Sequence, residues 1–228
     1  MQNLKTIYED ENVLVLDKPA GVNSDDFPKR AHRLDKDTSG VLLIAKDDKT
    51  LEFLQEQFRE RKVEKKYMAL VVGHLKNGEG KIETLLGRSP GDRRKQKAYL
   101  PNEPGVEKIH RKAITKYRVL QRFSAKGETS PAISERDGGN YELVEVEPKT
   151  GRKHQIRAHF VYLGHPIAGD KLYGFKNQPI PKDLARQFLH ASYLKIKLPS
   201  GEEKEFFSEL PEDLKKAISK LTNQPVHL

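Results

Sequence analysis

The sequence predicts an α+β protein in which a large mixed or antiparallel sheet carries helices on its outside. Three observations lead to this prediction. Segments with strand patterning outnumber those with helical spacing, several neighbouring strands alternate at a period of two, and short turn signals join them. The 228 residues suffice for one large domain with its own core.

The N-terminal third predicts three strands and a helix. The apolar run NVLVLDKPAG (residues 12–21) is a buried strand closed by a turn, and GVLLIAKD (40–47) is a second strand. Asp47 or Asp48 is expected to cap a helix in KTLEFLQEQFRERK, in which Leu51, Leu54 and Phe58 share one face. A third strand follows in KKYMALVVG (65–73).

The middle of the chain is rich in breakers. Residues 76–112 contain many glycines and prolines and are expected to be loop-like. Residues 113–123 and 141–148 alternate between apolar and polar side chains, which predicts two half-exposed antiparallel strands. The segment that joins them is expected to be a flexible connection.

The C-terminal third begins with helical spacing over residues 153–164. Two further strands, at 189–199 and 202–211, are expected to form a hairpin around Ser200 and Gly201. A short helix is predicted over 211–221, with a proline near its start.

Composition excludes several classes of function. The chain has no cysteine, which rules out disulfides, thiolate zinc sites and cysteine nucleophiles, and it lacks P-loop, dinucleotide-binding and G-x-S-x-G motifs. No run approaches the roughly 20 apolar residues of a membrane-spanning helix, and no signal peptide is recognisable. We therefore expect a cytoplasmic protein that does not act at a membrane, and nothing here demands more than a monomer.

The net charge of +9 is unevenly placed. Residues 88–122 contain eleven Lys or Arg and three acidic residues, a local charge of +8. Such a block suits a polyanion such as RNA, although a solvated charged surface is an equal alternative.

The segment HRLDKDTSG (residues 32–40) combines cations, carboxylates and turn residues. Asp37 to Gly40 predict a turn, whereas Asp35 lies just before it. If the backbone is extended there, Arg33 and Asp35 point to the same face, and neighbouring cations favour an ionised Asp35. Two alternatives remain from these residues alone, a solvated ion pair and a catalytic carboxylate.

Two other segments contain candidate site residues. Gly151 is followed by Arg152, Lys153, His154 and Arg157 at the start of a predicted helix, where free backbone N–H groups and cations suit a phosphate. The histidine spacing and the missing Glu make a metal site unexpected there. Tyr67 begins an apolar strand, so its ring is either a rim residue of the core or a stacking platform for a base.

Five segments in order resemble the RluA-type RNA pseudouridine synthases. They are VLDKPAGV, HRLDKDTSGVLLIAKD, KKYMALVVG, PKTGRKHQIRAHFVYLGHPIAGDKLYG and LHASYLKIKLP, within residues 7–215. The resemblance implies a catalytic domain of two sheet-containing halves with a central cleft. It also implies detachment of uracil from its ribose in RNA, rotation, and rejoining through C5, without cofactor or metal.

The resemblance also assigns roles. Asp35 matches the essential aspartate, which acts either as a nucleophile or by deprotonating C2′ of the sugar. Arg157 matches the cation that pairs with this aspartate, and Tyr67 matches the tyrosine that stacks on the uracil and helps to remove the C5 proton. Arg33 matches an arginine that fills the gap left by the flipped base. We expect Arg33, Arg152, Lys153 and His154 to bind RNA.

The chain departs from the family pattern in two ways. Only VNSDDFPKRA separates the KPAG turn from HRLD, where family members often carry several tens of residues, which leaves substrate choice open. The first strand is expected near residue 12, so we expect one catalytic domain over 1–228 and no separate S4-like domain. From the resemblance we expect the substrate to be ribosomal or transfer RNA. The alternatives are an RNA-binding or remodelling protein that keeps the fold without catalysis, and a hydrolase that uses Asp35 as a base.

Overall fold

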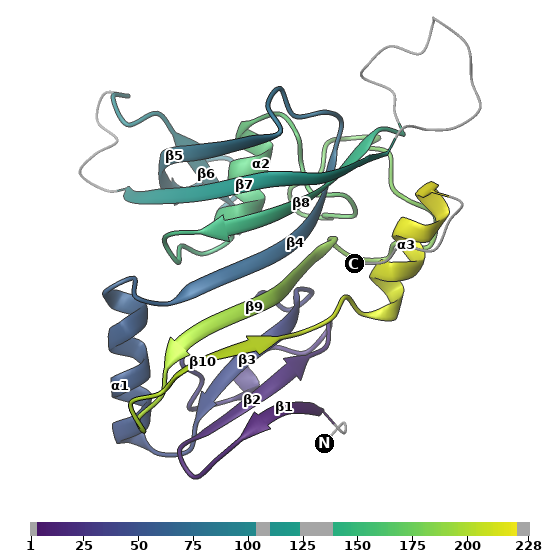
Figure 1. The fold of residues 1–228 in the computed structure, drawn as a ribbon. Coiled ribbons are helices and arrows are strands. Elements are labelled where there is room, and N and C mark those ends of the chain that lie inside the picture. The colour runs from purple at the N-terminus through teal and green to yellow at the C-terminus, as the bar shows by residue number, and fades with distance from the viewer. Residues whose placement is uncertain (1–3, 104–109, 124–138, 223–228) are drawn as a thin grey trace, which may run out of the picture. The chain divides into compact units, whose positions relative to one another are not determined.

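The computed structural model describes residues 4–103, 110–123 and 139–222. The chain forms two compact units, whose elements are labelled in Figure 1. Unit 1 comprises Met1–Tyr67 and Leu189–Leu210, and unit 2 comprises Met68–Phe188 and Pro211–Leu228. Each unit is mainly antiparallel sheet with few helices, which confirms the predicted α+β class. The prediction of a single catalytic domain stays a prediction.

Unit 1 is a sheet in which the order of strands is β1-β2-β3-β9-β10. All neighbouring pairs are antiparallel except β3 and β9, which pair in parallel through Ser39 with His190 and Gly40 with Ala191. The strands are β1 (Lys5–Glu9), β2 (Val13–Lys18), β3 (Ser39–Ala45), β9 (Leu189–Lys197) and β10 (Glu203–Phe207).

The parallel contact explains Gly40. Its φ of +115° lies in the region that favours glycine, and a Cβ atom there would lie 2.1 Å from the carbonyl oxygen of Ala191. Gly40 therefore lets two main chains approach, rather than closing a turn. The predicted turn over Asp37 to Gly40 is wrong by two residues: the amide of Thr38 donates to the carbonyl of Asp35 at 3.0 Å, and Ser39 already belongs to β3.

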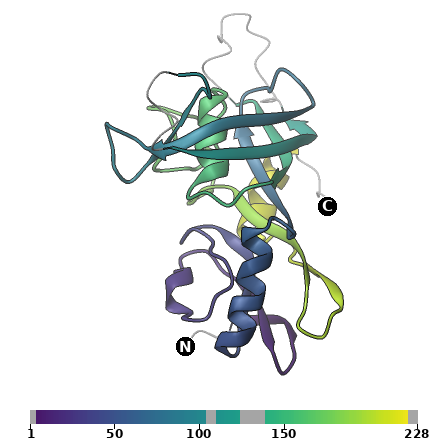
Figure 2. The ribbon, with the colours of Figure 1, turned by 90° about the vertical axis from the view of Figure 1, so that its left-hand side faces the viewer.

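One helix packs on the sheet of unit 1. Helix α1 (Asp48–Arg59) contacts β3 and β9 (Figure 2). Asp47 is its N-cap, because its carboxylate accepts hydrogen bonds from the amide and the hydroxyl of Thr50, each at 2.8 Å. A 3-10 turn, η1 (Ser24–Asp26), lies between β2 and β3. Leu54 joins the apolar residues of the strands in the core, with Leu51 and Phe58 at its edge.

In unit 2 the strands follow one another in the order β4-β8-β7-β5-β6. Strand β4 (Glu64–Val72) begins in unit 1 and continues into unit 2. The other strands are β5 (Glu79–Arg88), β6 (Gln96–Tyr99), β7 (Arg111–Phe123) and β8 (Tyr141–Pro148). Helix α2 (Gln155–Tyr162) packs against β6, β7 and β8, and α3 (Glu212–Thr222) follows Pro211.

Three strands are missing from the sequence prediction. The expected loop over 76–112 contains β5 and β6, because Gly80 and Gly87 lie inside β5 instead of breaking it. A Cβ at Gly80 would lie 2.7 Å from the ring of Tyr117, and one at Gly87 would lie 1.6 Å from the ring of His110. These glycines make room for rings on neighbouring segments.

The third missing strand is β1, which precedes the strand expected near residue 12. It was missed because only Ile7 and Tyr8 pack against the core, and the rest of β1 is exposed. The hairpin around Ser200 and Gly201 is confirmed by the antiparallel pairing of β9 and β10. Most of the expected flexible connection, residues 124–138, lies outside the described residues.

A buried polar network fixes α2 inside unit 2. Nε2 of His159 lies 3.0 Å from the hydroxyl of Thr84, and Nδ1 lies 2.8 Å from the hydroxyl of Thr115. The side-chain amide of Gln155 also donates to Thr115, at 2.9 Å, and its carbonyl accepts from Thr150 at 2.6 Å. Burial of the imidazole lowers the pKa of His159 to about 4.

This pKa predicts an acid-sensitive fold. The unfolded chain binds a proton on His159 below about pH 6.5, whereas the folded chain does so only below about pH 4. The free energy of unfolding should therefore fall between these values, by up to about 1.4 kcal/mol per pH unit from this residue. Urea unfolding at pH 7, 6 and 5 measures the slope. His159→Gln should flatten it, and an unchanged slope in that variant would assign the sensitivity to other groups.

Candidate active site

A buried lysine organises the loop that holds Asp35. The side chain of Lys18 is fully buried at the end of β2. Its ammonium donates to the carbonyls of Pro19, Val22 and Lys36 at 2.9, 2.8 and 3.1 Å. The amide of Gly21 also donates to the carbonyl of Lys36, at 2.9 Å. The ammonium of Lys18 therefore joins the KPAG turn to the residue after Asp35. The three carbonyl oxygens also compensate the buried positive charge.

A serine fixes the main chain on the other side of Asp35. The hydroxyl of Ser24 donates to the carbonyl of Leu34 at 2.8 Å and accepts from the amide of the same residue at 3.0 Å. The side chain of Leu34 is buried, that of Asp35 is half-buried and that of Arg33 is exposed. This alternation agrees with the extended backbone expected for Arg33 and Asp35.

The start of β3 is held by a histidine. Ser208 accepts a hydrogen bond through its carbonyl from Nε2 of His190 at 2.9 Å, so Nε2 bears the proton. Nδ1 of His190 lies 3.0 Å from the hydroxyl of Ser39, and the hydroxyl of Ser208 donates to Asp17 at 2.8 Å. The segment LHASYLKIKLP thus supports the Asp35 turn from β9.

Tyr67 and Asp35 interact within unit 1. Burial of the phenol and the negative charge of Asp35 both raise the pKa of Tyr67. The hydroxyl of Tyr67 therefore stays protonated at neutral pH, which makes it a hydrogen-bond donor. Asp35 comes from the HRLD segment and Tyr67 from β4, and the catalytic roles expected for them stay predictions.

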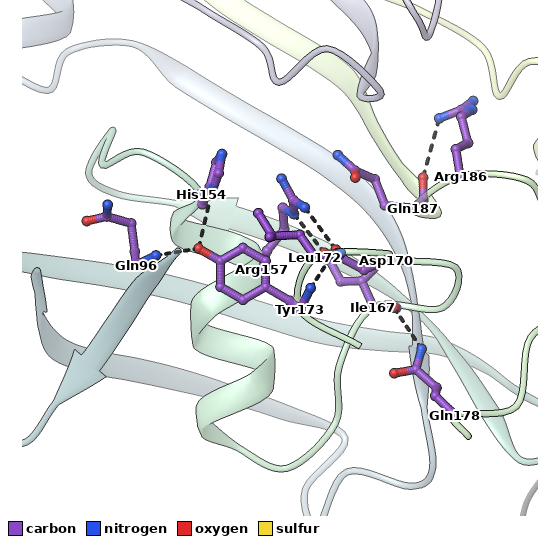
Figure 3. Close-up of polar contacts among 10 residues, drawn as sticks. All are labelled: Gln96, His154, Arg157, Ile167, Asp170, Leu172, Tyr173, Gln178, Arg186 and Gln187. Atoms are coloured by element: carbon purple, nitrogen blue, oxygen red, sulfur yellow. Dashed lines mark hydrogen bonds and ion pairs between the residues drawn. The ribbon is translucent and has the colours of Figure 1, made fainter. Parts of the chain in front are cut away.

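Arg157 is held by a carboxylate in unit 2 that the sequence prediction did not include. Nε and Nη2 of Arg157 donate to the two oxygens of Asp170 at 2.7 and 2.8 Å (Figure 3). The side chain of Asp170 is fully buried and also accepts from the amides of Leu172 and Tyr173 at 3.0 and 2.9 Å. The bidentate pair fixes the plane of the guanidinium. The expected pairing of Arg157 with Asp35 stays a prediction.

Tyr173 is a second residue that the sequence prediction missed. Its hydroxyl accepts from the amide of Gln96 at 2.6 Å and lies 3.1 Å from Nδ1 of His154 (Figure 3). The guanidinium carbon of Arg157 lies 4.9 Å from the centre of its ring. Both Asp170 and Tyr173 lie in the GDKLYG end of the segment that carried the family resemblance, so the signal was present.

The expected RNA-binding residues lie at exposed or partly exposed positions. His154 is the N-cap of α2 with a φ of +53°, an unusual conformation for a residue with a side chain, and the helix begins only at Gln155. Arg152 donates to the carbonyl of Lys112 at 3.1 Å, and Lys153 is exposed. In unit 1, the exposed Arg33 lies 3.9 Å from the carboxylate of Asp25.

The basic block of residues 88–122 is partly neutralised by its neighbours. On β7, Lys112 pairs with Glu83 at 2.5 Å, Arg118 with Glu145 at 3.3 Å and Arg122 with Glu142 at 2.8 Å. These glutamates come from β5 and β8 and lie outside the counted segment.

The hairpin of β5 and β6 keeps the excess charge. Residues 88–97 contain five Lys or Arg and one acid, Asp92, which pairs with Arg94 at 2.8 Å. Within the described part of the chain, no carboxylate pairs with Arg88 or Arg93. This hairpin is therefore the strongest cationic part of the block.

The described residues contain no group of three or more His, Asp or Glu side chains that could hold a metal ion. Among the same residues, no helix has the length and apolar character needed to span a membrane.

Comparison with known proteins identifies the family. The sequence model described as RNA pseudouridylate synthase matches residues 25–162, more than half of the chain. The chain belongs to the RNA pseudouridylate synthase family. The match begins before Asp35 and includes Tyr67 and Arg157. It confirms the resemblance found in the sequence.

Relatives in this family differ in length from the chain. The ribosomal large subunit pseudouridine synthase D of Borreliella burgdorferi is 36% identical over 90% of the chain, which spans 64% of that relative. An uncharacterized RNA pseudouridine synthase of Chloroflexus aurantiacus is 39% identical over 86% of the chain, which spans 54% of that relative. The structure of human RNA pseudouridylate synthase domain containing 1 superposes with a TM-score of 0.77 at 29% identity, covering 95% of this chain and 88% of the other.

The Arg157–Asp170 pair predicts a large loss of stability on mutation. Asp170→Asn should lower the free energy of unfolding by about 3 kcal/mol, because it leaves a buried guanidinium without its counter-charge. Urea unfolding measures the loss. Asp213→Asn is the matched control, since Asp213 also pairs with an arginine, Arg186, at 2.7 Å but is 49% exposed. The control should lose about 1 kcal/mol or less, and equal losses would contradict the role of burial.

Proposed function

We propose that this protein is an RNA pseudouridine synthase that isomerises uridines in RNA, with Asp35 as its catalytic carboxylate. Membership of the family supports the reaction class. The observation that carries the assignment is the position of Asp35, on a loop that Lys18 and Ser24 fix from both sides and within the electrostatic reach of Tyr67. A carboxylate held in this way is ordered before the substrate arrives.

The reaction that we propose needs no net addition of atoms. The bond between N1 of uracil and C1′ of ribose breaks, the base rotates, and C5 forms the new bond to C1′. The proton on C5 leaves to water, and N1 gains a proton. Asp35 either attacks the sugar or removes the proton from C2′, and both routes require its ionised form.

Tyr67 is proposed to stack on the flipped uracil. Its raised pKa supports a hydroxyl that stays protonated and donates a hydrogen bond. The ring of Tyr67 supplies the flat apolar surface for stacking. The same shift makes the hydroxyl a weak acceptor for the C5 proton, because its own proton would have to leave first. The expectation that Tyr67 removes the C5 proton therefore gains no support from its surroundings.

Arg157 is proposed to act from unit 2 as the cation that pairs with Asp35 when RNA is bound. Its clamp by Asp170 would keep the guanidinium plane fixed during turnover. Arg33 is proposed to fill the stack that the flipped base vacates, which suits its exposed and loosely paired guanidinium.

The substrate that we propose is ribosomal RNA, with transfer RNA as the alternative. The name of the Borreliella relative, which refers to the large ribosomal subunit, favours ribosomal RNA. The chain spans only part of that relative, so its target is a proposal for this chain. Arg152, Lys153 and His154 at the start of α2 are proposed to contact the RNA backbone.

The catalytic role of Asp35 is tested by tritium release. Total cellular RNA labelled with tritium at C5 of uridine should lose tritium to water when wild-type protein is added. Asp35→Asn should reduce the rate by roughly 10⁴-fold, because the essential carboxylate is lost. Asp37→Asn, two residues along in the exposed turn, is the matched control and should stay within about twofold.

The same assay distinguishes the alternatives. Release by Asp35→Asn at the wild-type rate would remove Asp35 from the mechanism. RNA binding without any release by the folded wild-type protein would favour the non-catalytic RNA-binding alternative.

A second experiment tests the hairpin of β5 and β6 as an RNA contact. The triple variant Arg88→Gln, Arg93→Gln, Lys97→Gln should weaken RNA binding and reduce the slope of log K against log salt by about 2, since each phosphate contact contributes about 0.7. The control is Lys81→Gln, Lys112→Gln, Arg118→Gln on β5 and β7, where each cation pairs with Glu83 or Glu145. It removes the same charge and should change the slope by less than half as much. Equal changes would show that binding follows net charge alone.

A further inference from the structure

Two adjacent lysines of β4 lie on opposite faces of the strand. Lys65 and Tyr67 are two residues apart on a strand and therefore share a face, whereas Lys66 points the other way. Nζ of Lys65 lies 5.8 Å from the ring centre of Phe58 on α1. Nζ of Lys66 lies 5.7 Å from the ring centre of Tyr193 on β9.

Among the residues that the structure describes, no anion lies beside Lys65 to compensate its charge. The imidazole of His32 stacks on Phe58, with ring centres 5.1 Å apart, and its Nε2 accepts a hydrogen bond from the amide of Leu43 at 3.2 Å. Burial and the charge of Lys65 lower the pKa of His32 to about 3, so this ring is neutral. Within residues 4–103, 110–123 and 139–222, no carboxylate pairs with Lys65 and no acceptor receives its protons.

The buried ammonium of Lys18, also in unit 1, differs from that of Lys65 in its hydrogen-bond acceptors. Three carbonyl oxygens accept its protons. Lys65 is half-buried against a ring, and burial lowers its pKa to about 8. At neutral pH the group is still a cation, and an anion that reached it would replace the lost hydration.

We propose that Lys65 binds a backbone phosphate of the RNA beside the uridine on which Asp35 and Tyr67 act. This inference rests on the proposed function. Tyr67 lies on the same strand face and feels the charge of Asp35, so the face of β4 that carries Lys65 is the face of the reacting nucleotide. A ribose separates the base from its phosphate, so a base against Tyr67 leaves a phosphate within reach of a long neighbouring side chain. Lys65 would therefore position substrate, and it would take no proton.

The test compares Lys65→Gln, Lys65→Arg and Lys66→Gln. Filter binding of tritium-labelled total cellular RNA gives Kd at several salt concentrations, and tritium release gives kcat and KM. Lys65→Gln should raise Kd and KM about tenfold and reduce the salt slope by about 0.7, with kcat within about threefold. Lys65→Arg should retain wild-type binding within about threefold. Lys66→Gln removes the same charge and should change Kd by less than twofold.

A variant that keeps the apolar stem controls for folding. Lys65→Met retains packing on Phe58 and removes the unsatisfied charge, so its Tm should equal or exceed that of the wild type while its Kd rises as in Lys65→Gln. A lower Tm with unchanged Kd would overturn the proposal in favour of a structural lysine.

Other outcomes separate this inference from the proposed function. Unchanged Kd and salt slope in Lys65→Gln, with inactive Asp35→Asn, would overturn the phosphate contact and leave the enzyme assignment intact. A fall in kcat with unchanged Kd would overturn it in favour of proton transfer by Lys65. A wild-type protein that releases no tritium but shows the Lys65-dependent salt slope would support the phosphate contact and overturn the enzyme assignment.

Discussion

Lys18 brings an ammonium group into the interior of unit 1, and three main-chain carbonyls from two separate turns accept its protons. Because a buried cation is costly without such acceptors, the two turns are constrained to stay together. The KPAG turn and the Asp35 turn are eighteen residues apart at the Lys18 to Lys36 contact. The position of Asp35 therefore depends on a residue that contacts no substrate in our proposal.

Unit 2 uses the same physical principle with the opposite charge at the centre. The buried carboxylate of Asp170 accepts two hydrogen bonds from Arg157 and two from main-chain amides. The acceptor oxygens of Asp170 are thus occupied by groups of its own unit, and the guanidinium of Arg157 cannot rotate freely. Unit 1 contributes Asp35 and Tyr67 to the proposed site, and unit 2 contributes Arg157. The loop that carries Asp35 is held by the buried cation of Lys18, and the guanidinium of Arg157 is held by the buried anion of Asp170.

Much of this arrangement was predictable from the sequence. Strands such as β2 and β3 are apolar runs between clear breakers, and Asp47 caps α1 as its position before the helix suggested. The family resemblance supplied Asp35 and Tyr67, which local residue chemistry alone left undecided. Strand β5 was missed because its two glycines look like breakers, and only the rings of Tyr117 and His110 explain them.

Charge was harder to predict than fold. The excess counted along residues 88–122 included cations of β7 that pair with glutamates on β5 and β8. A sum along the chain cannot include partners that only the sheet brings together. Asp170 was missed for a related reason. A carboxylate thirteen residues from its arginine shows no pairing in the local sequence, and only the family resemblance covered that residue.

The discontinuity of unit 1 has a consequence for biosynthesis. Strand β3 follows the Asp35 turn directly, yet its parallel neighbour β9 begins at Leu189, and the carbonyl that orients His190 belongs to Ser208. A ribosome must release some 170 further residues after Asp35 before that support exists, as the separation of the two segments requires. The nascent chain would therefore gain the support of the proposed catalytic carboxylate late, after most of unit 2 has been made.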